Sequence, residues 1–318
     1  MTGETRKGSS RLDVMPGAMP GAMPCLSPIA ALVRRHDRDR YQTALFAPPD
    51  RREALFALYA FNYEIARVRE AVTQPMLGQI RLQWWREAVA AAYAGAQPRY
   101  HLVAESLAAV IRDLAPAREH FERMIDTRER DLADEAPATL AALEDYAEGT
   151  SATLLYLVLD VLGVTEASTR AAVREVGIGY ALAGLLRAMP FHARAGRCYI
   201  PAQIAGRSGL DPRDYAGLRD TAGLREAVAE LAEAAAAHLQ TARRYRHEVP
   251  RSARAAMLPS VVAERFLARL KRADFNPFAP ELAAPDTLQS WRLFAAALRM
   301  TLSRIAGDGG PGPLGPGG

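Results

Sequence analysis

Residues 177–192 read GIGYALAGLLRAMPFH, a run in which small and apolar residues recur every three or four positions. At 3.6 residues per helical turn, Gly177, Tyr180, Gly184, Arg187 and Ala188 lie on one stripe of a helix. Small residues on such a stripe let another helix, or a ligand, come close. The run predicts a helix packed deep in the protein, and we expect Gly184 to be enclosed so tightly that a leucine there destabilises the fold.

The same period continues from Ser27 to about Ala306, and no alternating pattern typical of β-strands competes with it. Prolines stand near the starts or ends of most of these periodic segments. The predicted helices span about residues 28–37, 51–73, 75–94, 100–114, 116–133, 138–162, 166–192, 221–247, 251–271 and 286–305. The sequence therefore predicts an all-α fold, a single large helical bundle over residues 28–306.

The two ends of the chain have a different composition. Residues 1–27 contain MPGAMPGAMP, and residues 307–318 read GDGGPGPLGPGG. Glycine and proline at this density prevent regular structure. We expect a disordered leader over 1–27 and a disordered tail over 307–318.

Composition and charge limit the classes of function. The chain has 318 residues, 49% of them hydrophobic, and 40 basic against 36 acidic side chains. Its basic runs, such as RRHDRDR at 34–40, are interrupted by acids, which favours a solvated face over a nucleic-acid surface. Asp126 and Asp131 stand among arginines, which favours surface ion pairs over metal binding. We expect no nucleic-acid partner.

Cysteine content and hydropathy indicate the compartment. Cys25 and Cys198 are far apart in the sequence, so neither a disulfide framework nor a cysteine metal site is expected, and a reducing cytoplasm fits. No apolar run reaches the length that spans a bilayer. The sequence predicts a cytoplasmic protein, with peripheral contact to the inner membrane left open.

Residues 60–70, AFNYEIARVRE, carry polar groups in a helix that otherwise reads as buried. The helical period places Asn62 and Arg69 on the same face as Leu55 and Leu58. Burying charge is unfavourable unless the charge is paired. Such a cluster usually lines a cavity, a partner surface or a former binding site.

Four further stretches carry a resemblance to a known family. They are ALFALYAFN (54–62), LQWWREAV (82–89), LEDYAEGTSATLL (143–155) and LLRAMPFHARAGRCYIP (185–201). In these motifs the chain resembles the squalene/phytoene synthase family, whose members join two prenyl diphosphates. The resemblance implies a helical bundle of the isoprenoid-synthase type. It also implies two aspartate-rich motifs on facing helices, because a magnesium cluster must hold the diphosphate.

The chain departs from the family at these acidic positions. The carboxylates of the first motif correspond to Ala66, Arg67 and Glu70, and those of the second to Ala188, Phe191 and His192. Only Glu70 retains an acid, and arginine repels Mg²⁺. We therefore expect no catalytic residues, no metal and no cofactor.

Within the family, FNYEIARVRE, IRLQWWREAV, IDTRERDL, LLRAMPFHA and ADFNPFAP are similar to a branch that includes a mitochondrial assembly factor for respiratory complex I. This resemblance implies a non-catalytic protein that assists complex I assembly, with complex I subunits as partners and a prenyl or lipid molecule as ligand. The alternative is a transferase of the squalene/phytoene type that still condenses prenyl diphosphates, with an unrecognised replacement for the metal ligands.

The resemblance also implies a ligand-binding site at the former metal motifs. Its candidate residues are Asn62, Ala66, Arg67, Arg69, Glu70, Arg187, Ala188 and His192. The arginines either bind an anion by bidentate contacts, as an excess of positive charge there suggests, or form internal salt bridges with Glu64, Glu70 or Glu87. His192 either makes an ordinary hydrogen bond near a helix end or acts as a base.

Overall fold

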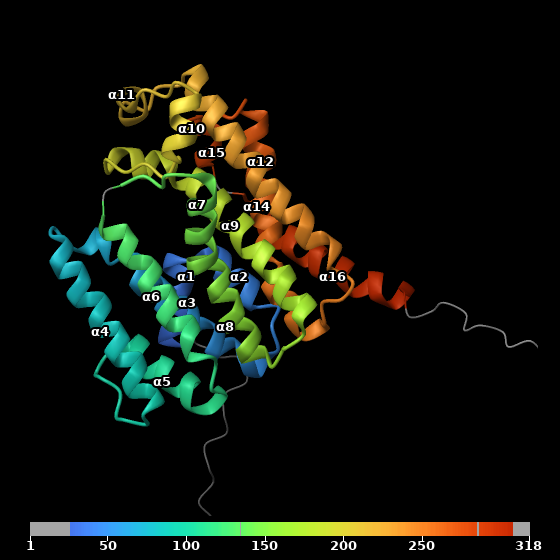
Figure 1. Cartoon of the computed structure of the whole chain (residues 1–318). Helices are drawn as coiled ribbons and strands as arrows, with labels where there is room; N and C mark the ends of the chain where they lie inside the picture. The colour runs from blue at the N-terminus through green and yellow to red at the C-terminus, as the bar shows by residue number, and fades with distance from the viewer. Residues whose placement is uncertain (1–25, 134, 285, 308–318) are drawn as a thin grey trace, which may run out of the picture.

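The computed structural model of the protein describes residues 26–133, 135–284 and 286–307. Throughout these ranges every regular element is helical and no strand occurs, as the sequence predicts (Figure 1). The predicted leader and tail lie outside the described residues, apart from Leu26, Ser27 and Gly307. None of the helices in the described ranges is long and apolar enough to cross a bilayer.

The bundle contains long helices joined by short helical turns. In chain order the elements are α1 (Pro28–His36), α2 (Arg38–Ala44), η1 (Pro49–Arg51), α3 (Arg52–Ala66), η2 (Arg69–Ala71), α4 (Pro75–Tyr93), α5 (Leu102–Leu114), α6 (Arg118–Glu129), η3 (Arg130–Leu132), α7 (Leu140–Ala147), η4 (Glu148–Ala152), α8 (Thr153–Leu162), α9 (Ala167–Arg194), α10 (Ala202–Arg207), α11 (Pro212–Ala216), α12 (Ala222–Arg244), η5 (Arg251–Ala253), α13 (Arg254–Met257), α14 (Pro259–Arg272), α15 (Pro280–Ala283) and α16 (Gln289–Gly307).

Two differences from the predicted helix boundaries bear on the site. The helix expected over 51–73 ends at Ala66, where the chain turns and buries Val68, so the residues after Ala66 leave the helical stripe. A separate helix, α2, begins after Asp37, whose carboxylate accepts a hydrogen bond from the backbone N–H of Arg40. This N-cap interrupts the run 34–40 that the sequence predicted as a solvated face.

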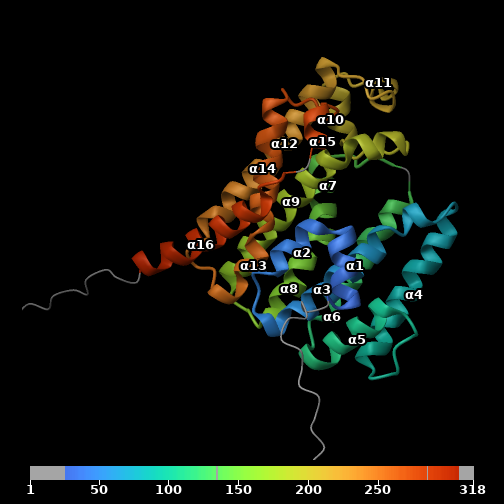
Figure 2. The same ribbon diagram turned by 180° about the vertical axis from the view of Figure 1, so that it is seen from behind.

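α9 is the central element of the bundle. It packs against α12 and α14 on one side and against α8 and η4 on the other. In the two views α4, α5 and α6 lie to one side of α9, and α12, α14 and α16 to the opposite side (Figures 1 and 2). One apolar core forms around α3, α6 and α8, and a second around α9, α12 and α14.

A π-helical turn, η4, interrupts the helix that the sequence predicted over 138–162. Glycines let this turn fit between its neighbours. A Cβ on Gly177 of α9 would lie 2.3 Å from the Cα atom of Ala152, and a Cβ on Gly149 would lie 2.3 Å from Oγ1 of Thr127. The turn can therefore approach α9 and α6 only because neither glycine has a side chain. π-Turns of this kind are frequent at functional sites.

Candidate functional site

A cavity of about 300 Å³ lies where α3, η4 and α9 face one another. It is lined by His36, Asp37, Arg40, Asn62, Arg128, Tyr146, Thr150, Ser151, Tyr180, Ala181, Gly184, Leu185, Arg187, Ala188 and His192. The π-turn supplies Thr150 and Ser151 to this lining. We call this space the central cavity.

Arg40 forms one wall of the central cavity. Its guanidinium donates to the carboxylate of Asp37 at 2.7 Å, and both side chains are only 15% exposed. The same guanidinium lies over the ring of Tyr180. Burial alone would lower the pKa of Arg40, but the Asp37 carboxylate and the Tyr180 hydroxyl outweigh it and raise the pKa. Arg40 is thus a permanently charged group whose anionic partner is already in place.

Arg128 occupies a second part of the wall, backed by a buried polar cluster. The Asp131 carboxylate accepts hydrogen bonds from the Arg128 guanidinium at 3.1 Å and from the hydroxyls of Tyr146 at 2.8 Å and Tyr199 at 3.0 Å. Asp131 is 7% exposed at its side chain. Burial and the Asp131 charge raise the pKa of Tyr199 to about 12, so its hydroxyl remains a donor. The prediction of a surface ion pair at Asp131 is wrong, because η3 turns the carboxylate inward.

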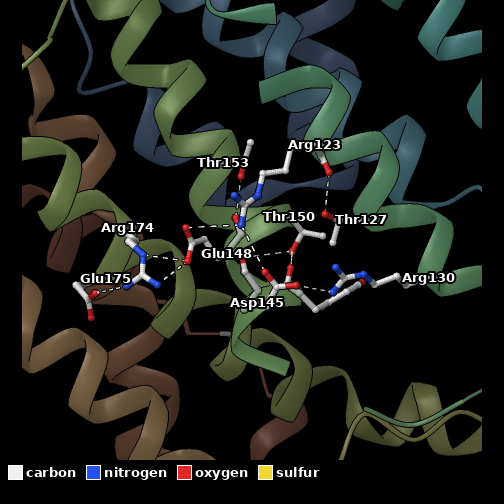
Figure 3. Close-up of polar contacts among 11 residues, drawn as sticks. Arg123, Thr127, Arg130, Asp145, Glu148, Thr150, Thr153, Arg174 and Glu175 are labelled. Carbon is white, nitrogen blue, oxygen red and sulfur yellow. Dashed lines mark hydrogen bonds and ion pairs between the residues drawn. The ribbon is translucent and has the colours of Figure 1, made fainter. Parts of the chain in front are cut away.

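A network of ion pairs holds the π-turn from the outside (Figure 3). Glu148 accepts hydrogen bonds from the Arg174 guanidinium of α9, the shorter at 2.5 Å, and lies 3.7 Å from Arg123 of α6. Arg130 pairs with Asp145 at 2.7 Å. These contacts tie α6, α7 and α9 together around η4, which fixes the turn that lines the central cavity.

Arg187 lies between the central cavity and a second cavity of about 350 Å³. It pairs with Asp39 of α2 at 2.7 Å. Burial would raise the pKa of Asp39, but Arg187 and Gln289 outweigh it and lower the pKa. The charged side chains that line the second cavity, among the described residues, are Arg38, Asp39, Arg187, Arg265, Arg269, Asp286 and Arg292. Arginines therefore outnumber carboxylates in the lining of both cavities.

The structure brings four of the eight candidate residues to the central cavity and leaves four outside its lining. Asn62, Arg187, Ala188 and His192 line it, and Asn62 is only 6% exposed. The four that do not line it are Ala66, Arg67, Arg69 and Glu70. Arg67, Arg69 and Glu70 follow the end of α3, so the stripe that carries Asn62 does not extend to them, whereas Ala66 is the last residue of that helix. Arg67 instead lies 3.7 Å from Glu64, a salt bridge that the sequence offered as an alternative.

His192 lies beside the rings of Phe191 and Tyr199. Its Nδ1 atom is buried and has no hydrogen-bond partner among the described residues, so the ordinary hydrogen bond expected near the helix end is not found at this atom. Burial, reinforced by the charge of Arg197, lowers the pKa of His192 to about 4. The imidazole is therefore neutral at pH 7.

Gly184 differs from its predicted role. A Cβ on Gly184 would meet no atom within 4 Å, because the residue lines the central cavity. The expectation that Gly184 is tightly enclosed is therefore wrong. The tight approach predicted for this stripe occurs at Gly177 instead.

Sequence reasoning missed the charged pairs that dominate the wall. Asp37 and Arg40 stand three positions apart, as do Arg128 and Asp131, and this spacing places both members of a pair on one helical face. That signal was present in the sequence. The sequence could not show that both faces are buried, because their burial depends on how α2 and α6 pack.

The central cavity does not fit the magnesium cluster that the family resemblance implies. Among the described residues that line it, Asp37 is the only carboxylate, and both of its oxygens accept hydrogen bonds from Arg40. Mg²⁺ requires several oxygen ligands in octahedral geometry, and two buried guanidinium groups repel a cation. The described residues contain no group of three or more His, Cys, Asp or Glu side chains placed to hold a metal ion.

Comparison with solved structures shows the same fold. A squalene synthase from Alicyclobacillus acidocaldarius superposes with a TM-score of 0.70 at 24% identity, covering 78% of this chain and 94% of that one. A dehydrosqualene synthase superposes with a TM-score of 0.74 at 15% identity, covering 87% and 95%. The likeness confirms the isoprenoid-synthase type of bundle.

Comparison of sequences shows which proteins this chain is related to. The chain is 32% identical to NADH dehydrogenase (ubiquinone) complex I, assembly factor 6, of Homo sapiens over 87% of this chain and 84% of that protein. It is 28% identical to a presqualene diphosphate synthase of Rhodopseudomonas palustris over 75% and 84%. The model of the squalene/phytoene synthase family matches residues 33–299. The chain therefore belongs to the squalene/phytoene synthase family.

Proposed function

We propose that the protein is a non-catalytic member of its family that assists the assembly of respiratory complex I. The relatives named complex I assembly factor 6 support this, because their similarity extends over most of both chains. The expected partners are complex I subunits. The expected site of action is the cytoplasmic face of the inner membrane.

The observation that carries the proposal is that the central cavity is lined by arginines paired within this chain and not by a set of carboxylates. Arg40, Arg128 and Arg187 each hold an aspartate of this chain at 3.1 Å or less. The interior of the scaffold is therefore held together by its own ion pairs rather than by a metal-diphosphate cluster. Removing the diphosphate of a prenyl substrate needs positive charge that neutralises the leaving group, and guanidinium groups already paired with aspartates supply little of it.

We propose further that the central cavity holds a prenyl or lipid ligand, contacted by Asn62, Arg187, Ala188 and His192. The neutral imidazole and the small side chains of Gly184 and Ala188 suit an apolar chain. The arginine-rich second cavity, which shares Arg187, suits an anionic headgroup.

Deletion and complementation test both parts of this proposal. In the organism that carries this chain, we expect deletion to lower the NADH:ubiquinone oxidoreductase activity of its membranes and the amount of assembled complex. Gly184→Leu fills the central cavity without a backbone clash, so it is expected to fold and yet restore little complex. The matched control is Gly206→Leu, which also has nothing within 4 Å of an added Cβ but lies on α10, away from the cavity.

Each result of this experiment has a distinct meaning. Unchanged complex I in the deletion strain contradicts the assembly function. If Gly184→Leu repairs the deletion defect as well as the wild type does, the proposal of a bound ligand is contradicted. The proposal of an assembly function is not affected by that result.

The presqualene diphosphate synthase relatives favour a second candidate function, the condensation of two prenyl diphosphates. We expect purified protein with Mg²⁺ and farnesyl diphosphate to form no condensed prenyl product above a heat-inactivated control, because the central cavity has no set of carboxylates to hold the metal. Product extraction and mass spectrometry measure this. Turnover that depends on Mg²⁺ would establish the transferase instead.

A further inference from the structure

The last helix, α16, exposes an apolar stripe. Trp291 is 70% exposed, Phe294 53% and Leu298 47%. Their spacing of three and four places them on one face of the helix. The sequence repeats this spacing with Leu302 and Ile305. Side chains of this size are usually buried, so the stripe marks an interaction surface.

The opposite face of α16 already attaches the helix to the body. Leu293 is fully buried in the second core, and Ala296, Ala297 and Met300 pack against it. Both views show the helix reaching outward from the bundle toward its C-terminal end (Figures 1 and 2). The outward stripe is therefore not needed to hold α16 in place, and it remains available to a partner.

The charge of α16 indicates the chemistry of that partner. Its sequence contains Arg292, Arg299 and Arg304 and no acidic residue. Arg292 is held by Asp286 at 2.7 Å, whereas Arg299 is exposed and lies about 100° around the helix from Leu298, at the edge of the stripe. An apolar face with Trp and Phe beside arginines is typical of helices that lie in the headgroup region of anionic bilayers.

We propose that α16 docks the protein on the surface of an anionic lipid bilayer, with Trp291, Phe294 and Leu298 entering the headgroup boundary and Arg299 contacting lipid phosphates. Burial of these three side chains together with attraction to anionic headgroups supplies the binding free energy. The inference goes beyond the assembly function and does not depend on it.

Vesicle co-sedimentation of the full chain tests the inference. We expect binding to vesicles of phosphatidylcholine mixed with phosphatidylglycerol, and at least about tenfold weaker binding after Trp291→Ser with Phe294→Ser. The matched control is Ile80→Ser with Tyr100→Ser, which removes an exposed aliphatic residue of α4 and an exposed aromatic residue just before α5, both far from α16. Tryptophan fluorescence is expected to shift to shorter wavelength with these vesicles in the wild type and not in the α16 variant.

The substitution Arg299→Gln tests the electrostatic contribution to vesicle binding separately from the apolar contribution. It should weaken binding to the mixed vesicles about fivefold and leave binding to pure phosphatidylcholine unchanged. The inference is overturned if wild-type protein does not sediment with the mixed vesicles, or if the control pair of substitutions weakens binding as much as the α16 pair. It is also overturned if light scattering shows a dimer that the α16 pair converts to a monomer, since a second copy would then cover the stripe.

Discussion

Asp131→Ala is expected to lower the free energy of unfolding by about 3–5 kcal/mol, the range for removing one partner of a buried ion pair. The carboxylate is 7% exposed and accepts hydrogen bonds from Arg128, Tyr146 and Tyr199. Its loss leaves a guanidinium without its counter-charge and two hydroxyls without an acceptor in a poorly solvated place. Denaturant unfolding followed by circular dichroism measures the change.

Asp126→Ala is the matched control, because Asp126 lies nearby on α6 and is also paired with an arginine. Its side chain is 63% exposed, and its contact with Arg86 is open to solvent. An exposed pair of this kind contributes about 1 kcal/mol or less. Equal losses in the two variants would show that the Asp131 cluster is hydrated, and the central cavity would then lack the rigid wall described here.

Gly177→Ala is expected to destabilise the protein by about 3 kcal/mol, although alanine is the better helix former. The added Cβ would lie 2.3 Å from the Cα atom and 2.6 Å from the backbone nitrogen of Ala152. Backbone atoms cannot rotate away as the end of a flexible side chain can, so α9 and η4 must separate. Thermal and denaturant unfolding measure the loss.

Gly184→Ala is the control on the same helix. Nothing lies within 4 Å of its added Cβ, so the gain in helix propensity, about 0.5–1 kcal/mol, is unopposed. Opposite signs for the two substitutions are the expected result. A stabilisation at both positions would mean that α9 does not approach the π-turn as closely as the structure shows.

The sequence alone determined the fold class and the positions of most long helices. The helical period of small and apolar residues is a local property, repeated along almost the whole chain, and a strand pattern never competes with it. The resemblance carried by residues 54–62 and 185–201 identified the family, which the family model confirms. The same period placed Asn62 on the buried face of its helix, where the structure has it.

The composition of the site was decided by tertiary structure. The helical period assigns a residue to a face but does not identify its partner on another helix, and two contacts of the site join residues that are distant in sequence. Arg187 meets Asp39 from α2, and Asp131 meets Tyr199 from beyond α9. Whether an arginine is solvated or buried against an aspartate depends on which helices cover it, and this packing is set by the whole bundle.

The same reasoning explains why the surroundings of two glycines on α9 differ. Gly177 and Gly184 share one stripe of α9, and no local rule distinguishes them. The π-turn lies against Gly177, whereas Gly184 lines the central cavity. The sequence therefore predicted a stripe that permits close approach. Only the packed structure decided which part of that stripe meets a backbone and which part meets open space, because close approach is a property of two surfaces and the sequence of one helix describes only one of them.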